Sequence, residues 1–149
     1  MYDCHDNLKL ENQLCFPLYV CSKEVIRRYK PFLDGLDLTY TQYIAMMALW
    51  EHGSLSVKDL GSLLFLDSGT LTPLLKKLEE KGLVSRVRDP GDDRVVIVSA
   101  TKEGMAMRDC ARPIPDSMKS CISLPAEDAV ELSRILKKLM GMFGDPTSY

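Results

Sequence analysis

The stretch SVKDLGSLLFLDSGTLTPLLKKLEEKGLVSRVRDPGDDRVVIVS, residues 56–99, decides how this chain folds. Ser56 can accept the free backbone N–H groups of a first helical turn, and Asp59 follows it at capping-box spacing. Apolar residues then recur at helical spacing, first over residues 57–64 and again over residues 71–78. The pattern predicts a short helix, a turn and a second helix.

The second of these helices carries a polar face opposite its leucines. Short hydroxyl side chains at a helix start, with lysines further along, suit contacts to phosphates and base edges of DNA. The candidates for such contacts are Asp67, Ser68, Thr70, Thr72, Lys76 and Lys77. Pro73 restricts the helix start: with Thr70 as the N-cap it occupies the third helical position, whereas an earlier start implies a kink.

Gly82 ends the second helix, and a β-hairpin is predicted directly after it. Residues 83–88 and 94–99 alternate apolar and polar side chains and are rich in β-branched residues. The sequence DPGDD at 89–93 is turn-forming, with Arg94 at its exit. Helix, turn, helix and hairpin together predict a winged helix-turn-helix. That unit binds DNA in many proteins and serves only protein contacts in others.

Residues 66–101, LDSGTLTPLLKKLEEKGLVSRVRDPGDDRVVIVSAT, resemble the MarR family of winged-helix regulators, most closely its organic-hydroperoxide-sensing branch, the OhrR repressors. The D-x-R motif of the wing is present as Asp92–Arg94, and residues 10–22 and 38–51 also fit that branch. The resemblance implies a mainly α-helical fold with a small β-hairpin wing and an intertwined homodimer. We expect it to bind near-palindromic double-stranded DNA, with Arg94, oriented by Asp92, in the flanking minor groove.

The bulk composition suits one globular domain rather than a generic nucleic-acid coat protein. The chain has 149 residues, 46% of them hydrophobic, and a formal net charge of −2. Residues 76–102 hold seven basic and five acidic side chains. Because this positive excess is weak, affinity for DNA must come from shape complementarity and from two copies of the winged helix-turn-helix.

A cytoplasmic chain without metal or cofactor is expected. The longest unbroken apolar run, residues 44–50, is too short to span a bilayer, and no signal peptide is recognised. Five cysteines are an odd number, which argues against a static disulfide framework. The chain has no C-x-x-C motif and only two histidines, so neither a metal ion nor a cofactor is predicted.

Long helices with apolar stripes are predicted at both ends of the chain. The first spans about residues 10–29 and is ended by Pro31 and Gly35, and the last follows Pro125. A single copy has little left to cover both stripes, so a symmetric dimer with interleaved terminal helices is the simplest solution. A monomer in which the two helices pack on each other is the alternative.

The chain is expected to form a single MarR-type domain over residues 1–149. Dimerisation helices at about 8–30 and 101–149 would flank a winged helix-turn-helix, DNA-binding part at about 39–100. Residues 113–125, which include several prolines, are the only linker-like segment.

Two further helices are predicted from their caps. Thr39 begins one of them, with Gln42 at capping-box spacing. Its apolar face is expected to consist of Ile44, Met47 and Ala48. Trp50, on the same helix, is expected to pack in the core rather than to contact a cofactor. Thr101 begins a helix over about residues 102–112.

Cys15, near the start of the first helix, is the candidate redox residue. A helix N-terminus favours the reactive thiolate, although a free cysteine is often only a small apolar residue. Tyr29 and Tyr40 could stabilise a thiolate by donating hydrogen bonds. Cys15 and Tyr29 are 14 residues apart on one predicted helix, and at ~1.5 Å per residue this is roughly 21 Å. They can therefore meet only across subunits. Tyr19, one turn after Cys15, is a neighbour or a core residue.

The resemblance implies the same arrangement, with the cysteine as peroxide sensor and both tyrosines from the other subunit. It implies a repressor that releases DNA when an organic hydroperoxide oxidises Cys15. A regulator that binds a small aromatic ligand non-covalently is the alternative. An enzyme is not expected, because thiol peroxidases of the peroxiredoxin type place Thr three residues before the reactive cysteine. In this chain the residues three positions before the cysteines at 15, 21, 110 and 121 are Asn12, Leu18, Met107 and Met118, so that motif is absent.

Two end products of Cys15 oxidation remain open. Members of this branch either cap the sensor with a small external thiol or form an inter-subunit disulfide with a second cysteine near the C-terminal helices. Cys121 lies where such a partner would fall, in a segment rich in Pro and Ser that we expect to move. Cys110, on a predicted helix, is the rival.

Overall fold

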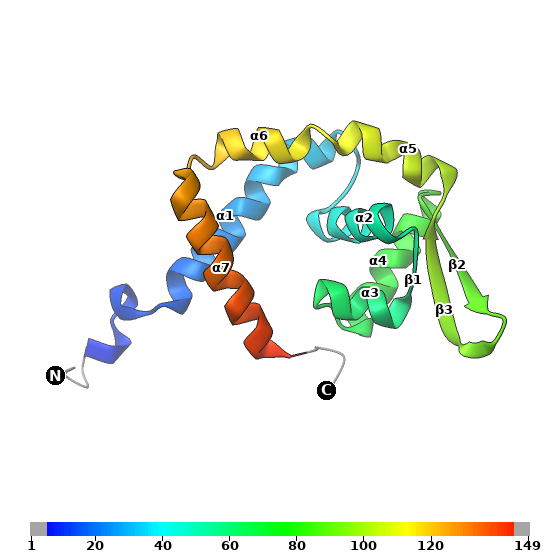
Figure 1. The fold of residues 1–149 in the computed structure, drawn as a ribbon, viewed down its shortest axis with the longest axis horizontal. Helices are drawn as coiled ribbons and strands as arrows, with labels where there is room; N and C mark the ends of the chain where they lie inside the picture. The colour runs from blue at the N-terminus through cyan, green and yellow to red at the C-terminus, as the bar shows by residue number, and fades with distance from the viewer. Residues whose placement is uncertain (1–5, 145–149) are drawn as a thin grey trace.

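The computed structural model describes residues 6–144 and separates a compact part of the chain from two helical arms (Figure 1). We call residues 40–100 the reading block. In chain order the elements are short 3₁₀ helices at Asp6–Leu8 and Leu10–Asn12, α1 (Cys15–Asp34), α2 (Tyr40–His52), β1 (Ser54–Ser56), α3 (Val57–Leu64), α4 (Ser68–Glu80), β2 (Val84–Asp89), β3 (Asp92–Ala100), α5 (Lys102–Ala111), α6 (Ile114–Cys121) and α7 (Ala126–Phe143). The predicted fold class, mainly α with a small β wing, is confirmed. Across residues 6–144, no helix combines the length and apolar character needed to cross a membrane.

The helices α2 and α3 begin at the capping residues that the sequence predicted, and α4 ends next to the predicted glycine. Thr39 Oγ1 accepts a hydrogen bond from Gln42 N at 3.3 Å, and Gln42 Oε1 accepts one from Thr39 N at 3.0 Å, which completes the capping box. Ser56 Oγ accepts from Asp59 N at 3.0 Å at the start of α3. Gly82, at φ +74°, follows the end of α4 in the left-handed conformation that glycine adopts without strain.

α4 takes the earlier of the two possible starts, so Pro73 does not lie in its first turn. Asp67, rather than Thr70, is the N-cap, and its Oδ1 accepts from Thr70 N at 2.7 Å. A carboxylate is a stronger acceptor than a hydroxyl and also complements the helix dipole. Pro73 therefore lies inside the helix, where it removes the amide that would have bonded to the carbonyl of Gly69.

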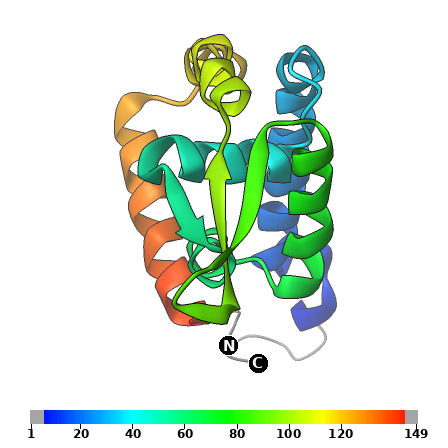
Figure 2. The ribbon, with the colours of Figure 1, turned by 90° about the vertical axis from the view of Figure 1, so that its right-hand side faces the viewer.

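The wing is the outer part of a three-stranded antiparallel sheet with the strand order β1-β3-β2. The β2–β3 hairpin was predicted, and its turn is formed by Pro90 and Gly91. β1 was not predicted: Ser54 pairs with Ser99 of β3, and their hydroxyl oxygens are 2.7 Å apart. In Figure 2 the strands lie in front of α2, with α4 beside them.

Most of the core lies in the reading block. Its largest fully buried side chains are Met46, Leu49, Leu60, Leu71, Leu75, Leu78 and Val98. The predicted apolar face of α2 was partly wrong, because Met47 is 44% exposed whereas Tyr43, Ala45 and Met46 are buried. α2 is contacted by α1, α3, α4, α5 and the sheet, so it is buried on several sides rather than along one stripe. Trp50 packs against the core as expected, and its Nε1 donates to Gly104 O at 2.8 Å.

The first long helix begins later and ends later than predicted. α1 starts at Cys15, because residues 6–12 form separate 3₁₀ turns. Pro17 therefore falls in the first turn, where its missing N–H is tolerated. Pro31 does not end the helix, which continues to Asp34 with Leu33 buried in the core; Gly35 is the C-cap, as predicted.

Most of the segment expected to be a linker is helical. Pro113 is the N-cap of α6, and Pro115 occupies its first turn, so prolines begin this helix instead of breaking it. Ile114 and Met118, four residues apart, bury one face. Cys121 is the last residue of α6, so it lies in a helix and not in a linker; its movement on oxidation stays a prediction. Only residues 122–125 separate α6 from α7.

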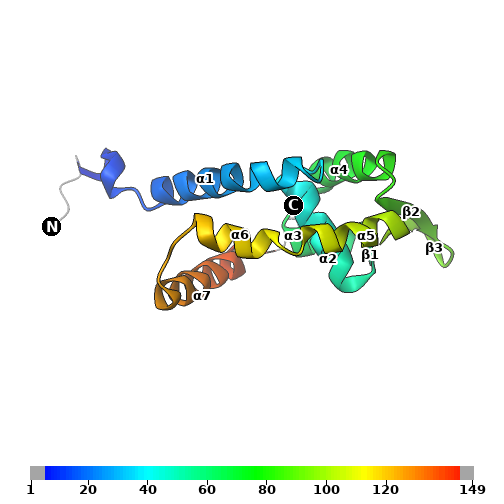
Figure 3. The same cartoon turned by 90° about the horizontal axis from the view of Figure 1, so that it is seen from above.

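The terminal helices leave their apolar stripes uncovered. α7 has no buried residue, and α1 buries only Leu33. The two helices overlap in Figure 1, but the view from above in Figure 3 shows that they lie apart. The alternative of a monomer with these helices packed on each other is therefore wrong. Large apolar side chains remain exposed on both, among them Leu18, Ile26, Val130, Leu132 and Ile135.

Candidate DNA-reading surface and redox site

The wing presents one arginine to solvent in a fixed orientation. Arg94 is 89% exposed in its side chain. Its Nε and Nη2 donate to the two carboxylate oxygens of Asp92 at 3.0 and 3.1 Å, and its backbone N donates to Oδ1 at 3.0 Å. These bonds lower the pKa of the Asp92 carboxyl. The predicted pairing is present, and it holds the guanidinium at the tip of the hairpin.

A groove joins the wing to the helix-turn-helix. It has a volume of about 580 Å³ and is lined by α3, the first turns of α4 and the outer strand residues. Among the predicted contact residues it brings together Asp67, Ser68, Thr72 and Arg94. Arg86 also lines it, and was not singled out from the sequence. Its position in the alternating pattern of the hairpin was the available signal.

The remaining candidates lie on other sides of α4. At 100° per residue, Thr70 and Lys77 share one flank and are about half a turn from Ser68. Lys77 lines a separate cleft with Lys30 and Lys81. Lys76 is exposed between the two flanks. The structure thus brings four of the predicted contact residues together in the wing groove, whereas Lys77 lies on the opposite side of α4.

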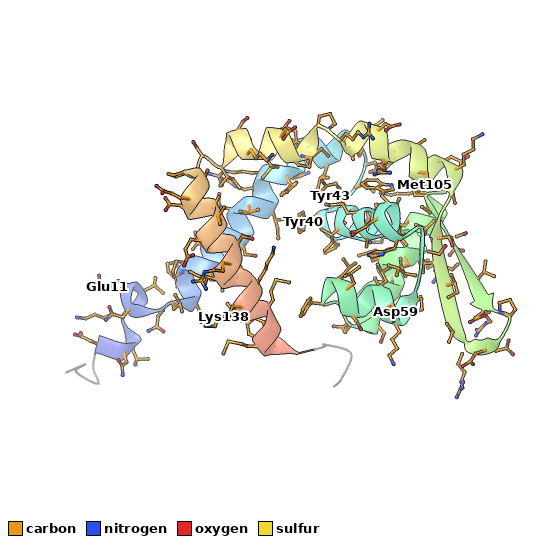
Figure 4. All side chains as sticks on the ribbon, viewed as in Figure 1. Glu11, Tyr40, Tyr43, Asp59, Met105 and Lys138 are labelled. Atoms are coloured by element: carbon orange, nitrogen blue, oxygen red, sulfur yellow. The ribbon has the colours of Figure 1, made fainter. Side chains whose placement is uncertain are left out.

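Three tyrosine rings meet where α1 packs on the first turn of α2. The ring centroids of Tyr29 and Tyr40 are 5.1 Å apart, and those of Tyr29 and Tyr43 are 5.8 Å apart. Tyr43 extends the cluster to Trp50 at 6.4 Å. Figure 4 shows Tyr40 and Tyr43 at the end of α2 that is nearer to α1. Sequence reasoning missed Tyr43, although its spacing of three residues from Tyr40 places both on one helical face.

These phenols are hydrogen-bond donors at neutral pH. Burial is the main cause that raises the pKa of Tyr29, Tyr40 and Tyr43 above the usual value. Each ring therefore keeps its proton through the physiological range and can donate it to an anion.

Cys15 lies at the opposite end of the helix that carries Tyr29. It is the first residue of α1, and its side chain is exposed. Cys15 and Tyr29 are 14 positions apart on one continuous helix, which is roughly 21 Å along the helix axis. Tyr19 is 61% exposed, and its ring lies 5.5 Å from Lys23 Nζ, so it is not a core residue in this chain.

The other described cysteines are all exposed: Cys21, Cys110 and Cys121. Cys4 lies outside the described residues. Cys110 and Cys121 are both helical, so secondary structure does not separate them as candidate partners of Cys15. Within residues 6–144, no group of three or more His, Cys, Asp or Glu side chains could hold a metal ion.

Comparison with known proteins places this geometry among transcription regulators. The family described as "Transcriptional regulator SarA/Rot" matches residues 27–109. The organic hydroperoxide resistance transcriptional regulator of Bacillus subtilis is 46% identical over 135 residues, which are 91% of this chain and 92% of that protein.

Among solved structures, reduced AbfR bound to DNA, a Staphylococcus epidermidis protein, matches with a TM-score of 0.77 at 30% identity over 93% of this chain and 97% of that one. Disulfide-formed AbfR, also at 30% identity, gives a TM-score of 0.61 over 93% of this chain and 92% of that one. The present fold is therefore more similar to this DNA-bound structure than to the disulfide-formed one.

Proposed function

This chain belongs to the MarR-type family of winged-helix transcription regulators, in its organic-hydroperoxide-sensing branch, and we propose that it is a homodimeric repressor that releases DNA when Cys15 is oxidised. The 1–149 chain would act as a single domain in the cytoplasm, with dimerisation helices at about 8–30 and 101–149 and the DNA-binding part at about 39–100. Relatives named as regulators, not enzymes, support this class of function.

The reading block supplies a surface shaped for B-DNA. The start of α4 would enter the major groove, and Arg94 would enter the flanking minor groove with Asp92 holding its guanidinium. Bases and phosphates would be contacted by Asp67, Ser68, Thr70, Thr72, Lys76 and Lys77. Asp67 also caps α4, so its carboxylate would be only partly free for DNA. Because the net charge is −2, two copies on a near-palindromic site would be needed for tight binding.

A second copy accounts for the exposed stripes of α1 and α7. Val130 is 71% exposed and Leu14 is 84% exposed, and burying such side chains against a partner is worth about 25 cal/mol per Å² of apolar surface. An isologous dimer places the α1 start of one subunit near the α1 end of the other when the helices cross antiparallel.

The position of the tyrosine cluster carries the redox proposal. Tyr29 and Tyr40 are in ring contact within one chain, while Cys15 of the same chain lies at the far end of α1. An antiparallel dimer would bring the partner's phenols to the thiolate, with two neutral donors stabilising its charge. The site would therefore be complete only in the dimer.

The chemistry that we propose needs only the hydroperoxide. The Cys15 thiolate attacks the outer peroxide oxygen, the O–O bond breaks, and the alkoxide leaves and takes up a proton to become the alcohol. Sulfur is oxidised to sulfenic acid and the peroxide is reduced. The tyrosines then lose the anion to which they donated, which changes the packing at the junction of α1 and α2.

A Cys15–Cys121 inter-subunit disulfide would be the second step. The Cys121 thiol attacks the sulfenic sulfur, the disulfide forms and water leaves. The Cα atoms must come within about 7 Å, and residues 122–125 after α6 offer a short non-helical segment for such a shift. Capping by a small external thiol is the other outcome. A covalent dimer on non-reducing electrophoresis that vanishes in Cys15→Ser and Cys121→Ser would indicate the Cys15–Cys121 disulfide, while one that survives in Cys121→Ser would transfer the role to another cysteine.

A gel shift with DNA upstream of the gene for this protein tests the function. Wild type should bind that DNA when reduced and release it on addition of cumene hydroperoxide. Cys15→Ser should bind and stay bound, and Tyr29→Phe should slow oxidation. Release of Cys15→Ser by peroxide would place the sensor elsewhere. Release by a phenolic compound without oxidation would instead support a regulator with a non-covalent ligand.

A further inference from the structure

One lysine at the end of α4 bridges to the loop between α1 and α2. Lys81 is the C-cap of α4, and its side chain is 30% exposed. Its ammonium donates to the backbone carbonyl of Asp37 and lies 3.3 Å from Asp37 Oδ2 and 3.4 Å from Gln42 Oε1. An ammonium has three N–H donors, and these three oxygens can use all of them. In Figure 3, α4 lies just beyond the C-terminal end of α1.

Gln42, which accepts a hydrogen bond from Lys81, lies in the first turn of α2 together with Tyr40 and Tyr43. Gln42 is 3% exposed and is the one buried polar or charged residue in the core of the described chain. Its Oε1 also accepts from Thr39 N, so one oxygen closes the capping box of α2 and holds the end of α4. Tyr40 and Tyr43 flank Gln42 in the same helical turn.

We propose that Lys81 is the positioning residue that couples the tyrosine cluster to the recognition helix α4. A change at the Tyr29–Tyr40 contact would shift the first turn of α2, and the Lys81 bonds would carry this shift to the end of α4. This inference rests on the proposed redox function, because it names the route by which Cys15 oxidation reaches the DNA surface.

Charge-assisted hydrogen bonds are suited to this role. Apolar packing between α2 and α4 holds the two helices together, but it is not directional. Bonds from one ammonium to a carboxylate, a carbonyl and a buried amide have defined lengths and directions. The positive charge also complements the C-terminal end of the α4 dipole. Through its contact with Gln42, Lys81 links the end of α4 to the turn that contains Tyr40.

The test compares DNA release in Lys81→Met, Lys81→Arg and wild type. Methionine keeps an unbranched side chain up to the ε position and removes the donors, and arginine restores charge and donors. Lys30→Met is the matched control, because Lys30 lines the same cleft but bonds to Asp34 on its own helix. The measured quantity is the ratio of the DNA Kd after cumene hydroperoxide to the Kd before it, with Cys15 oxidation followed separately by mass spectrometry.

Allosteric ratios are typically about 5- to 150-fold, and we expect wild type, Lys81→Arg and Lys30→Met to fall in this range. Lys81→Met should be oxidised at the wild-type rate and bind DNA when reduced, but its ratio should fall to within about threefold of one. A wild-type ratio in Lys81→Met would overturn the proposal. If that variant does not bind DNA at all, Lys81→Gln replaces it, because glutamine removes the charge and shortens a side chain that is 30% exposed; an undiminished ratio there would also overturn the proposal.

A second measurement is independent of peroxide. Coupling is reciprocal, so DNA binding should slow amide hydrogen exchange in residues 40–43 of wild type and Lys30→Met, but not of Lys81→Met. Equal protection in all three proteins would refute the link. Failure of wild type to release DNA with peroxide would refute the proposed function alone, since this exchange experiment would still decide the role of Lys81.

Discussion

The reading block and the arms of this protein are built in opposite ways. All the largest fully buried side chains lie in α2, α3, α4 and β3, whereas α7 buries nothing. The α2 and α3 starts are closed by side-chain caps, and α1 and α7 start without one. A region that buries its own apolar surface can be stable alone, and a region that does not must obtain that burial from a partner.

This difference assigns different tasks to the two regions. The DNA surface needs a fixed shape, and the block provides it through its own core. The proposed redox site needs parts from two chains, because Cys15 lies at the free end of an arm while Tyr29 and Tyr40 lie where that arm meets the block. Assembly of the dimer and assembly of the sensor are then the same event.

The largest effect on the free energy of unfolding is expected when a buried side chain of the reading block is shortened and leaves a cavity. Leu75 is fully buried, so Leu75→Ala should lower the free energy of unfolding by about 2–5 kcal/mol at any protein concentration. Ile135 on α7 is 48% exposed, and Ile135→Ala should act mainly by weakening the dimer, with a loss that depends on protein concentration. Denaturant unfolding at two concentrations measures both. A concentration-independent loss of equal size in Ile135→Ala would mean that α7 is stabilised within one chain.

A smaller effect is expected at the junction between block and arm. A Cβ added at Gly104 would come within 2.1 Å of the carbonyl oxygen of Leu83, a backbone atom that cannot move aside easily. Gly104→Ala should therefore lower the free energy of unfolding by about 1–3 kcal/mol or more.

Gly35→Ala is the matched control for that change. Its Cβ would meet only Phe32 O at 3.5 Å, and its φ is −64°, so the substitution should be neutral or stabilise by up to about 1 kcal/mol. Thermal unfolding compares the two. Equal melting temperatures for both variants would show that α5 does not depend on close contact with the start of the sheet.

The smallest effect on stability is expected at the wing tip. Arg94→Ala should weaken DNA binding by about 1–3 kcal/mol at matched salt without changing the melting temperature, because the side chain is 89% exposed. Arg112→Ala, which removes the same charge from an exposed site at the end of α5, is the control. Fluorescence anisotropy with operator DNA measures the affinity of both variants. An equal loss of affinity in the two would show that Arg94 contributes only its positive charge and no specific contact.

Local signals in the sequence predicted the elements whose ends are chemically marked. Thr39, Ser56 and Thr101 begin helices because their hydroxyls accept amide hydrogen bonds three residues later. The Asp92–Arg94 pair was also predictable, since the two residues are only two positions apart at the start of β3. Cys15, Tyr29 and Tyr40 were identified by resemblance, and their separation followed from helix geometry alone.

Elements with weak local signals were missed. β1 has only three residues, too few for a periodic pattern, and it forms because the edge of β3 is present to pair with it. α6 was read as a linker because proline usually breaks helices, yet at a first turn it is compatible with them. The buried faces of α2 were misassigned because a helix surrounded on several sides has no single stripe.

The sequence by itself determined the order of the helices and strands other than β1 and α6, the caps at Thr39, Ser56 and Thr101, the wing pair and the distance between Cys15 and Tyr29. Only the tertiary structure decided that Tyr43 joins the tyrosine cluster, that Lys81 reaches Gln42, and that α1 and α7 stay apart. The first set depends on contacts within a few residues, which sequence spacing specifies directly. The second set depends on how separate elements pack against a common core, where the partner of each side chain is chosen by the whole fold.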